Sequence, residues 1–93
     1  MEKINVHPRI NQRHSNLTDS DVTDAWSNII HSRTRIEEEP FECVAVGVDG
    51  NGRLIEMVAV RIENGSTLIF HAMTPPTKKT LRELNLSGAR RAQ

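Results

Sequence analysis

Apolar residues recur at helical spacing in the segment "NLTDSDVTDAWSNIIH". The residues at positions i, i+3, i+4, i+7 and i+8 of this stripe are Val22, Ala25, Trp26, Ile29 and Ile30. Such spacing places all of them on one face of a helix, which predicts that this face packs on the core. Thr18 precedes the stripe, and Asp21 follows Thr18 by three residues, so the two can form a capping box. The pattern therefore predicts a helix that begins after Thr18, with Trp26 as a core anchor rather than a surface for stacking bases.

The segments on either side of this helix have weaker patterns. Upstream, Pro8 suits the first turn of a helix, so a short helix ending near Ser15 is predicted. Downstream, "RTRIEEEPFE" mixes charged residues with Pro40. This composition favours a connecting loop, from which Ile36 could contact the core.

Three segments have the composition of β-strands, namely residues 41–48, 53–62 and 67–73. The gaps between them, "DGNG" and "ENGS", are short and contain glycine, which is typical of hairpins. Thr74 can then cap a last helix that has Pro75 at its first position and ends near Leu84. The sequence thus predicts an α+β fold with two N-terminal helices, a three-stranded antiparallel sheet and a C-terminal helix.

The last strand leads directly into a basic helix. In a regular strand, alternate residues face opposite sides, so Leu68, Phe70 and Ala72 would share one face and Ile69, His71 and Met73 the other. In the helix that follows, the cationic side chains at Lys78, Lys79 and Arg82 project from adjoining turns. This arrangement predicts a cationic patch close to an imidazole.

Length and composition restrict the class of protein. The chain has 93 residues, of which 37% are hydrophobic and 26% charged, as expected for one small domain spanning residues 1–93. Residues 87–93 are expected to form a flexible basic tail. Cys43 is the only cysteine, so an internal disulfide is excluded and no zinc-binding spacing is present. With neither a signal peptide nor a membrane-spanning segment in the pattern, a cytoplasmic location is expected.

The charges are unevenly distributed although they sum to zero. Basic residues gather near both ends of the chain, and the middle holds most of the acidic ones, with Glu37, Glu38 and Glu39 as the densest group. If the two ends meet in space, they form a basic face that can attract a polyanion. The alternative, that these charges only keep the surface hydrated, is left open by the sequence.

A histidine among fixed cations is what RNA cleavage without a metal requires. One group removes the proton of a ribose 2′-hydroxyl, another protonates the leaving 5′-oxygen, and cations stabilise the charge on phosphorus. Histidine can do either task near neutral pH because its ordinary pKa is about 6.5. His71 is one candidate, and His14, with Arg13 beside it, is another. Each also has a structural alternative, as a half-buried strand residue or a solvated helix end.

Three stretches together resemble a known family. "RHSNLTDSDVTDAW", "VAVGVDGNGRLIEMVAV" and "LIFHAMTPPTKKTLREL" are similar, in this order, to the BrnT toxins of the RelE-like superfamily of toxin ribonucleases. The family motifs correspond to Arg13-His14, Gly52-Arg53, His71-Ala72 and Lys78-Lys79. The chain departs from the family at Met73, where a basic residue is common, and at Ser15, where glycine is usual.

The resemblance implies a RelE-like fold with three or four antiparallel strands and a metal-independent endoribonuclease of a type II toxin–antitoxin system. It implies RNA as the substrate, a cognate antitoxin as the partner, and no cofactor or metal; a homodimer within such a complex is left open. The residues it suggests for the site, together with those selected above, are His14, His71, Lys78, Lys79 and Arg82 for catalysis and Arg13 and Arg53 for substrate binding. A non-catalytic interaction module and a nucleic-acid-binding regulator remain as alternatives, although three aromatic residues leave little for stacking on bases.

Overall fold

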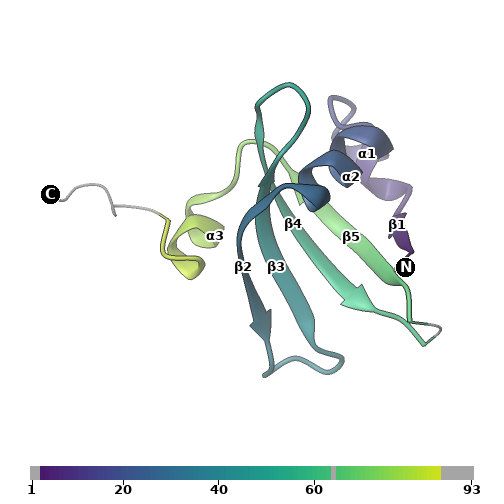
Figure 1. Cartoon of the computed structure of the whole chain (residues 1–93), viewed down its shortest axis with the longest axis vertical. Helices are drawn as coiled ribbons and strands as arrows, with labels where there is room; N and C mark the ends of the chain where they lie inside the picture. The colour runs from purple at the N-terminus through teal and green to yellow at the C-terminus, as the bar shows by residue number, and fades with distance from the viewer. Residues whose placement is uncertain (1–2, 64, 87–93) are drawn as a thin grey trace, which may run out of the picture.

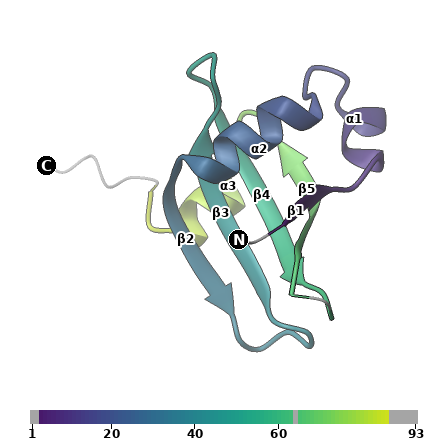
Figure 2. The same cartoon turned by 45° about the vertical axis from the view of Figure 1, so that its right-hand side comes forward.

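The chain forms one mixed five-stranded sheet with helices on both faces (Figures 1 and 2). The computed structural model describes residues 3–63 and 65–86, so the predicted tail at residues 87–93 lies outside the described residues. The elements in chain order are β1 (Ile4–Val6), α1 (Arg9–Arg13), α2 (Asp19–Ser27), β2 (Ile29–Arg35), β3 (Glu42–Val48), β4 (Leu54–Arg61), β5 (Thr67–Met73) and α3 (Lys78–Glu83). The strand order is β1-β5-β4-β3-β2, and β1 is parallel to β5 while the other neighbours are antiparallel. The predicted α+β class and the β3-β4-β5 meander are confirmed, but the three-stranded antiparallel sheet is wrong.

The two additional strands lie at the edges of the sheet. β1 is only three residues long, too short for a recognisable pattern, and it exists because it pairs with β5 far along the chain. β2 occupies what was predicted as the last turn of a helix and the start of a loop. The helix ends at Ser27, and Ile29 and Ile30 are β-branched residues that suit a strand. Ile36, expected near the core, is 70% exposed.

Helix α2 begins as predicted. Thr18 accepts a hydrogen bond from the backbone N–H of Asp21, and the Asp21 carboxylate accepts one from the N–H of Thr18, which completes the capping box. Val22 and Ala25 are buried, and Trp26 packs against the same apolar cluster, as expected for a core anchor. Local sequence pattern therefore determines this helix up to Ser27.

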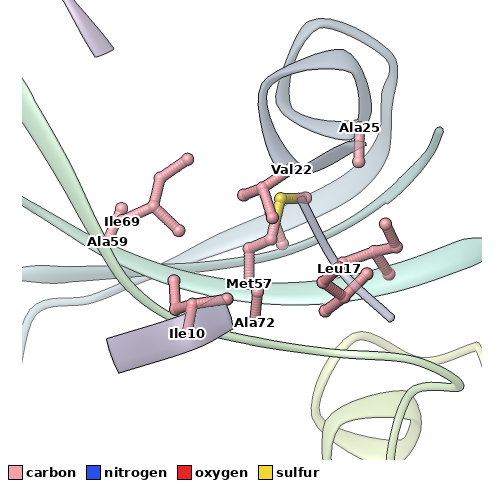
Figure 3. Close-up of a cluster of buried hydrophobic side chains, with 10 residues drawn as sticks. Ile10, Leu17, Val22, Ala25, Met57, Ala59, Ile69 and Ala72 are labelled. Carbon is pink, nitrogen blue, oxygen red and sulfur yellow. The ribbon is translucent and has the colours of Figure 1, made fainter. Parts of the chain in front are cut away.

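Helices α1 and α2 cover one face of the sheet (Figure 1). The larger apolar cluster lies between them and the strands; its buried members are Ile10, Leu17, Val22, Ala25, Ala45, Ile55, Met57, Ala59, Ile69 and Ala72. In Figure 3 the Met57 side chain extends from the sheet toward Val22 of α2. The backbone of α2 comes so close to β3 at Gly47 that a Cβ atom there would lie 2.0 Å from the carbonyl oxygen of Ala25.

Helix α3 lies on the opposite face and covers a smaller cluster. Its buried Leu84 packs with Val44, Val46 and Val58, and Phe70 lies against the same group. The helix is capped by Thr77, whose hydroxyl accepts from the N–H of Thr80, and not by Thr74 as predicted. The hydroxyl of Thr74 instead donates to the carbonyl of Leu54 at 2.7 Å, which ties the end of β5 to the start of β4. No helix among the described residues is long and apolar enough to cross a bilayer.

An irregularity in β5 changes which side chains share a face. Val58 pairs with His71 but Ala59 pairs with Ile69, so Phe70 is an extra residue opposite β4. As a result Ile69 and Ala72 both belong to the cluster under α1 and α2, while Phe70 packs on the α3 face. The predicted alternation, with Phe70 and Ala72 on one face, is therefore wrong. The bulge places His71 on the α3 face, opposite Val58.

Candidate functional site

A cavity of about 270 Å³ opens where α1 meets the last strand. Because β1 ends at Val6, the second half of β5 has no strand neighbour on that side, and α1 lies along it instead. The Arg9 guanidinium reaches the carbonyl oxygen of Phe70 at 3.5 Å. The cavity is lined by Arg9, Ile10, Arg13, His14, Arg35, Glu42, Val58, Phe70, His71 and Ala72. Its lining therefore combines an apolar floor with a cationic rim.

The rim is basic because Arg9, Arg13 and His14 have no acidic partner among the described residues, whereas Arg35 is paired with Glu42 and Glu83. Of the described residues that line the cavity, Glu42 alone carries a carboxylate, and it accepts a hydrogen bond from Arg35 at 2.9 Å. Within residues 3–63 and 65–86, neither Arg13 nor His14 makes a side-chain hydrogen bond or ion pair. The unpaired positive charges at this cavity can therefore attract an anion, although the net charge of the chain is zero.

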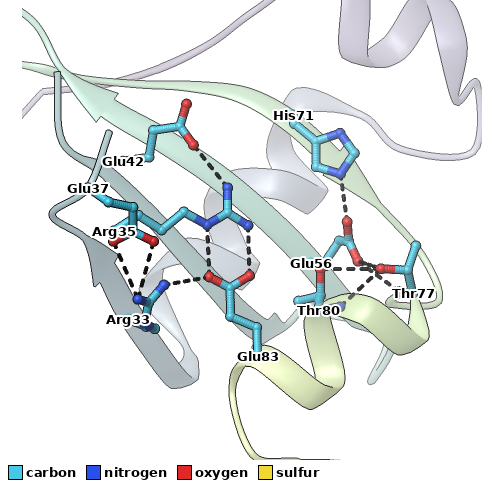
Figure 4. A network of polar contacts seen from close by, with 9 residues as sticks. All are labelled: Arg33, Arg35, Glu37, Glu42, Glu56, His71, Thr77, Thr80 and Glu83. Carbon is cyan, nitrogen blue, oxygen red and sulfur yellow. Dashed lines mark hydrogen bonds and ion pairs between the residues drawn. The ribbon is translucent and has the colours of Figure 1, made fainter. Parts of the chain in front are cut away.

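The imidazole of His71 is held by a buried carboxylate (Figure 4). Nε2 of His71 lies 2.7 Å from Oε2 of Glu56, a residue that is only 4% exposed. The other carboxylate oxygen, Oε1, accepts from the backbone N–H of Thr77 at 2.7 Å and from its hydroxyl at 2.9 Å. Burial by itself would raise the pKa of Glu56, but the hydrogen bonds from His71 and Thr77 outweigh it and lower the pKa to about 2. Glu56 is therefore an ionised acceptor at neutral pH.

A second polar network, on the same face of the sheet, holds α3 against β2, as Figure 4 also shows. The Arg35 guanidinium donates two hydrogen bonds of 2.8 Å to Glu83, and Arg33 donates a third of 2.8 Å to the same carboxylate. These hydrogen bonds, led by those from Arg35, lower the pKa of Glu83 against the opposing effect of burial. Since β2 supplies both arginines, the edge strand missed by the sequence pattern anchors the helix that covers the cavity's face.

The structure divides the predicted site residues among three places. Arg13, His14 and His71 line the one cavity, although α1 and β5 are far apart in the chain. The side chains of Lys78, Lys79 and Arg82 are exposed on α3 and do not line the cavity, while Thr80 and Leu84 face inward. The roles assigned to all of them stay predictions.

Arg53 occupies the third place, at the turn between β3 and β4. Its guanidinium donates to Asp49 at 2.8 Å, to Asp21 at 3.1 Å and to the carbonyl of Asn16 at 3.0 Å. It therefore ties the turn to the start of α2 and lies outside the cavity lining. The predicted role of Arg53 in substrate binding stays untested.

Sequence reasoning missed two residues that shape this site. Arg9 lines the cavity, and Glu56 orients His71 without lining it. The sequence did contain an indication of the role of Glu56. It is the one carboxylate in the apolar run "LIEMVAV", and a carboxylate in a buried strand requires hydrogen-bond partners. No sequence pattern indicated Arg9, because the residue that it contacts in space, Phe70, is sixty-one positions away in the chain.

A larger cavity, of about 400 Å³, opens on the other face of the sheet beside the end of α2. Trp26, Phe41 and Cys43 are among its lining residues. Burial raises the pKa of the Cys43 thiol, which disfavours the thiolate needed for nucleophilic attack. In the described part of the chain, no three His, Cys, Asp or Glu side chains converge in a way that could hold a metal ion.

Comparisons with known proteins found no relative of this chain. No protein-family model matches the chain, and no match was found among curated proteins or solved structures. The chemistry of the cavity is therefore inferred from its own residues.

Proposed function

We propose that this chain is a metal-independent endoribonuclease, with the RelE-like architecture and toxin role of a BrnT-like protein. The observation that supports this most directly is the convergence of His14 and His71, with Arg9 and Arg13, on one cavity. Two imidazoles can act as proton acceptor and proton donor, and the guanidinium groups can bind phosphate oxygens in pairs.

The reaction would be an intramolecular transfer at phosphorus. One histidine takes the proton of the ribose 2′-hydroxyl as its oxygen bonds to phosphorus, and the bond from phosphorus to the 5′-oxygen breaks. The other histidine, protonated, gives its proton to that leaving oxygen. The products are a 2′,3′-cyclic phosphate and a 5′-hydroxyl, so atoms and charges balance without a metal or cofactor. Arg9 and Arg13 stabilise the negative charge that develops on the phosphoryl oxygens.

The rest of the α3 face would extend the contact with RNA. Phe70 and Val58 give the cavity an apolar floor against which a base can lie. Lys78, Lys79 and Arg82 are exposed on the helix that covers this face, where they can meet phosphates on either side of the cleaved bond. In this proposal Arg9 and Arg13 supply the cations that the family carries near Met73.

The biological setting rests on the family resemblance. A toxin of this kind acts on cytoplasmic RNA and is neutralised by a cognate antitoxin. A segment of that antitoxin could cover the basic cavity and exclude RNA from it. Co-purification of the chain with the product of a neighbouring open reading frame, and loss of cleavage in that complex, would support this setting.

The test is cleavage of a labelled single-stranded RNA in the presence of a chelator. We expect the parent protein to cleave, and the His14→Ala, His71→Ala double variant to lose activity by a factor on the order of 10³ or more, because both proton transfers are lost. The control is His31→Ala, which removes an exposed imidazole from β2, outside the cavity lining, and should cleave like the parent. A double variant as active as the control would refute the proposal.

The binding alternative gives a different result in the same assay. If no protein cleaves RNA but the parent binds it, and binding weakens in steps as cavity cations are replaced, the cavity is a binding site rather than an active site. Circular dichroism of each variant shows whether a loss reflects chemistry or unfolding.

A further inference from the structure

The carboxylate of Glu56 determines which nitrogen of His71 can accept a proton. Glu56 is ionised at neutral pH and can only accept hydrogen bonds, so the 2.7 Å contact requires a proton on Nε2 of His71. In the neutral imidazole the other nitrogen, Nδ1, then carries no proton. Figure 4 shows Nδ1 on the side of the ring away from Glu56. Because His71 lines the cavity and its Nε2 is engaged by Glu56, Nδ1 is the ring nitrogen left for a ligand in the cavity.

Thr77 keeps this carboxylate in place. Its backbone N–H and its hydroxyl both donate to Oε1 of Glu56, at 2.7 Å and 2.9 Å. The same hydroxyl accepts from the N–H of Thr80, so the carboxylate is joined to the first turn of α3. With Oε1 held by two donors, only Oε2 can face His71. The orientation of the imidazole therefore depends on β4 and on α3, and not on β5 alone.

We infer that Glu56 is a positioning residue that holds His71 in the tautomer with the proton on Nε2, so that Nδ1 is the general base of the site. This inference rests on the proposed function. In the reaction, Nδ1 takes the proton of the 2′-hydroxyl while the oxygen bonds to phosphorus, and His14 protonates the leaving 5′-oxygen. Glu56 stays ionised throughout and stabilises the imidazolium of His71 that forms when the proton arrives.

Replacing the carboxylate by an amide should reverse the tautomer. In Glu56→Gln the amide has one oxygen, and the backbone N–H and hydroxyl of Thr77 both require it. The amide NH₂ then faces Nε2 of His71, which must accept, and the imidazole proton moves to Nδ1. With a proton already on Nδ1, His71 cannot act as the base. We expect kcat to fall by a factor on the order of 10² or more, with KM little changed.

The tautomer is measured directly by long-range ¹⁵N–¹H correlation spectra of the imidazole, recorded as a pH series and read at high pH, where the ¹⁵N shifts of His71 no longer change. The parent should show the proton of His71 on Nε2, and Glu56→Gln should show it on Nδ1. The matched control is Glu83→Gln, which also replaces a carboxylate on the α3 face but contacts Arg33 and Arg35 rather than His71. That control should keep the parental tautomer.

These measurements separate the inference from the proposed function. A parent protein with its proton on Nδ1, which needs no variant to observe, overturns the inference, as does a Glu56→Gln protein that keeps the proton on Nε2. A reversed tautomer with an unchanged kcat overturns the assignment of Nδ1 as the base. If the parent does not cleave RNA at all, the proposed function and the catalytic role of Nδ1 both fail, while the tautomer spectra still decide whether Glu56 positions the imidazole.

Discussion

At the scale of single residues, Glu56 contributes to the stability of the fold and also positions the His71 imidazole of the candidate site. It is nearly fully buried in the sheet, and three hydrogen bonds from His71 and Thr77 favour its charged form. Its pKa falls from an ordinary 4.5 to about 2 on folding. Because the folded pKa is the lower one, the stabilisation is fully present above pH 4.5 and is lost as the pH falls from about 4.5 to about 2.

This linkage predicts how acid affects the protein. A shift of this size corresponds to about 3 kcal/mol in the free energy of unfolding. Urea unfolding of the parent and of Glu56→Gln, repeated at several pH values, should give a difference in stability that shrinks by about 3 kcal/mol on acidification through this window. Asp21, Asp49 and Glu83 also have lowered pKa values, so the difference between the two proteins is the informative quantity. A difference in unfolding free energy between the two proteins that does not change with pH would contradict the lowered pKa of Glu56.

At the scale of elements, the closest approach in the fold is that of α2 to β3. The carbonyl oxygens of Ala25 and Asn28, at the end of α2, lie against Gly47, and the N–H of Val48 donates to the Asn28 carbonyl at 3.2 Å. Only a residue without a Cβ atom leaves room for this contact. Gly47 therefore sets how deeply the helix sits on the sheet and, with it, how well the larger apolar cluster is covered.

Gly47→Ala should consequently be one of the more damaging small substitutions in the chain. A Cβ atom would overlap the carbonyl group of Ala25, which can move only with the whole helix, so we expect a loss of about 3 kcal/mol or more in the free energy of unfolding. Gly50→Ala is the matched control, because its Cβ atom meets only the Asp24 side chain, at 3.3 Å. Chemical denaturation of both should show a loss below about 1 kcal/mol for the control. If Gly47→Ala and Gly50→Ala were equally stable, α2 would have to lie farther from β3 than described.

At the scale of the whole molecule, the two faces of the sheet serve different purposes. One face carries α1, α2 and most of the buried apolar side chains. The other carries α3 and a smaller apolar cluster (Figure 2). The basic cavity opens at the edge between them, where α1 lies beside β5, and its lining includes Val58, Phe70 and His71 from the α3 face. The exposed cations of α3 lie on this second face, outside the cavity. Their effect on RNA should therefore be on binding, through the field of the whole face, and not on the chemical step.

The Lys78→Ala, Lys79→Ala, Arg82→Ala triple variant tests this division. Its affinity for single-stranded RNA should be lower, and the slope of log affinity against log salt should be smaller by up to about 2, since each phosphate contact contributes roughly 0.7. The rate at saturating RNA should stay within about 3-fold of the parent, whereas Arg13→Ala should lower that rate by a factor on the order of 10². Lys3→Ala removes one exposed cation on the β1 side, and so measures the effect per charge of a change in net charge elsewhere on the molecule. A triple variant that binds normally but reacts slowly would place these cations in the active site.

Much of the fold and part of the site could be predicted from local pattern. The start of α2 depends on Thr18 and Asp21, which are neighbours in the chain, and the three central strands depend on short runs separated by glycine turns. His14 could be selected as a candidate because it adjoins Arg13, and His71 because its strand leads into the basic segment that contains Lys78 and Lys79. Their presence in one cavity could not be predicted, since that depends on α1 lying along β5.

The sequence by itself determined the class of the fold, the central meander and the chemical types available for a site, because these depend on residues within a few positions of one another. The tertiary structure alone decided the edge strands, the bulge at Phe70 and the pairing of Glu56 with His71, because each requires contacts between distant segments. Such contacts form only when the whole chain packs, and burial of the carboxylate between β4 and α3 then leaves it no better partners than His71 and Thr77.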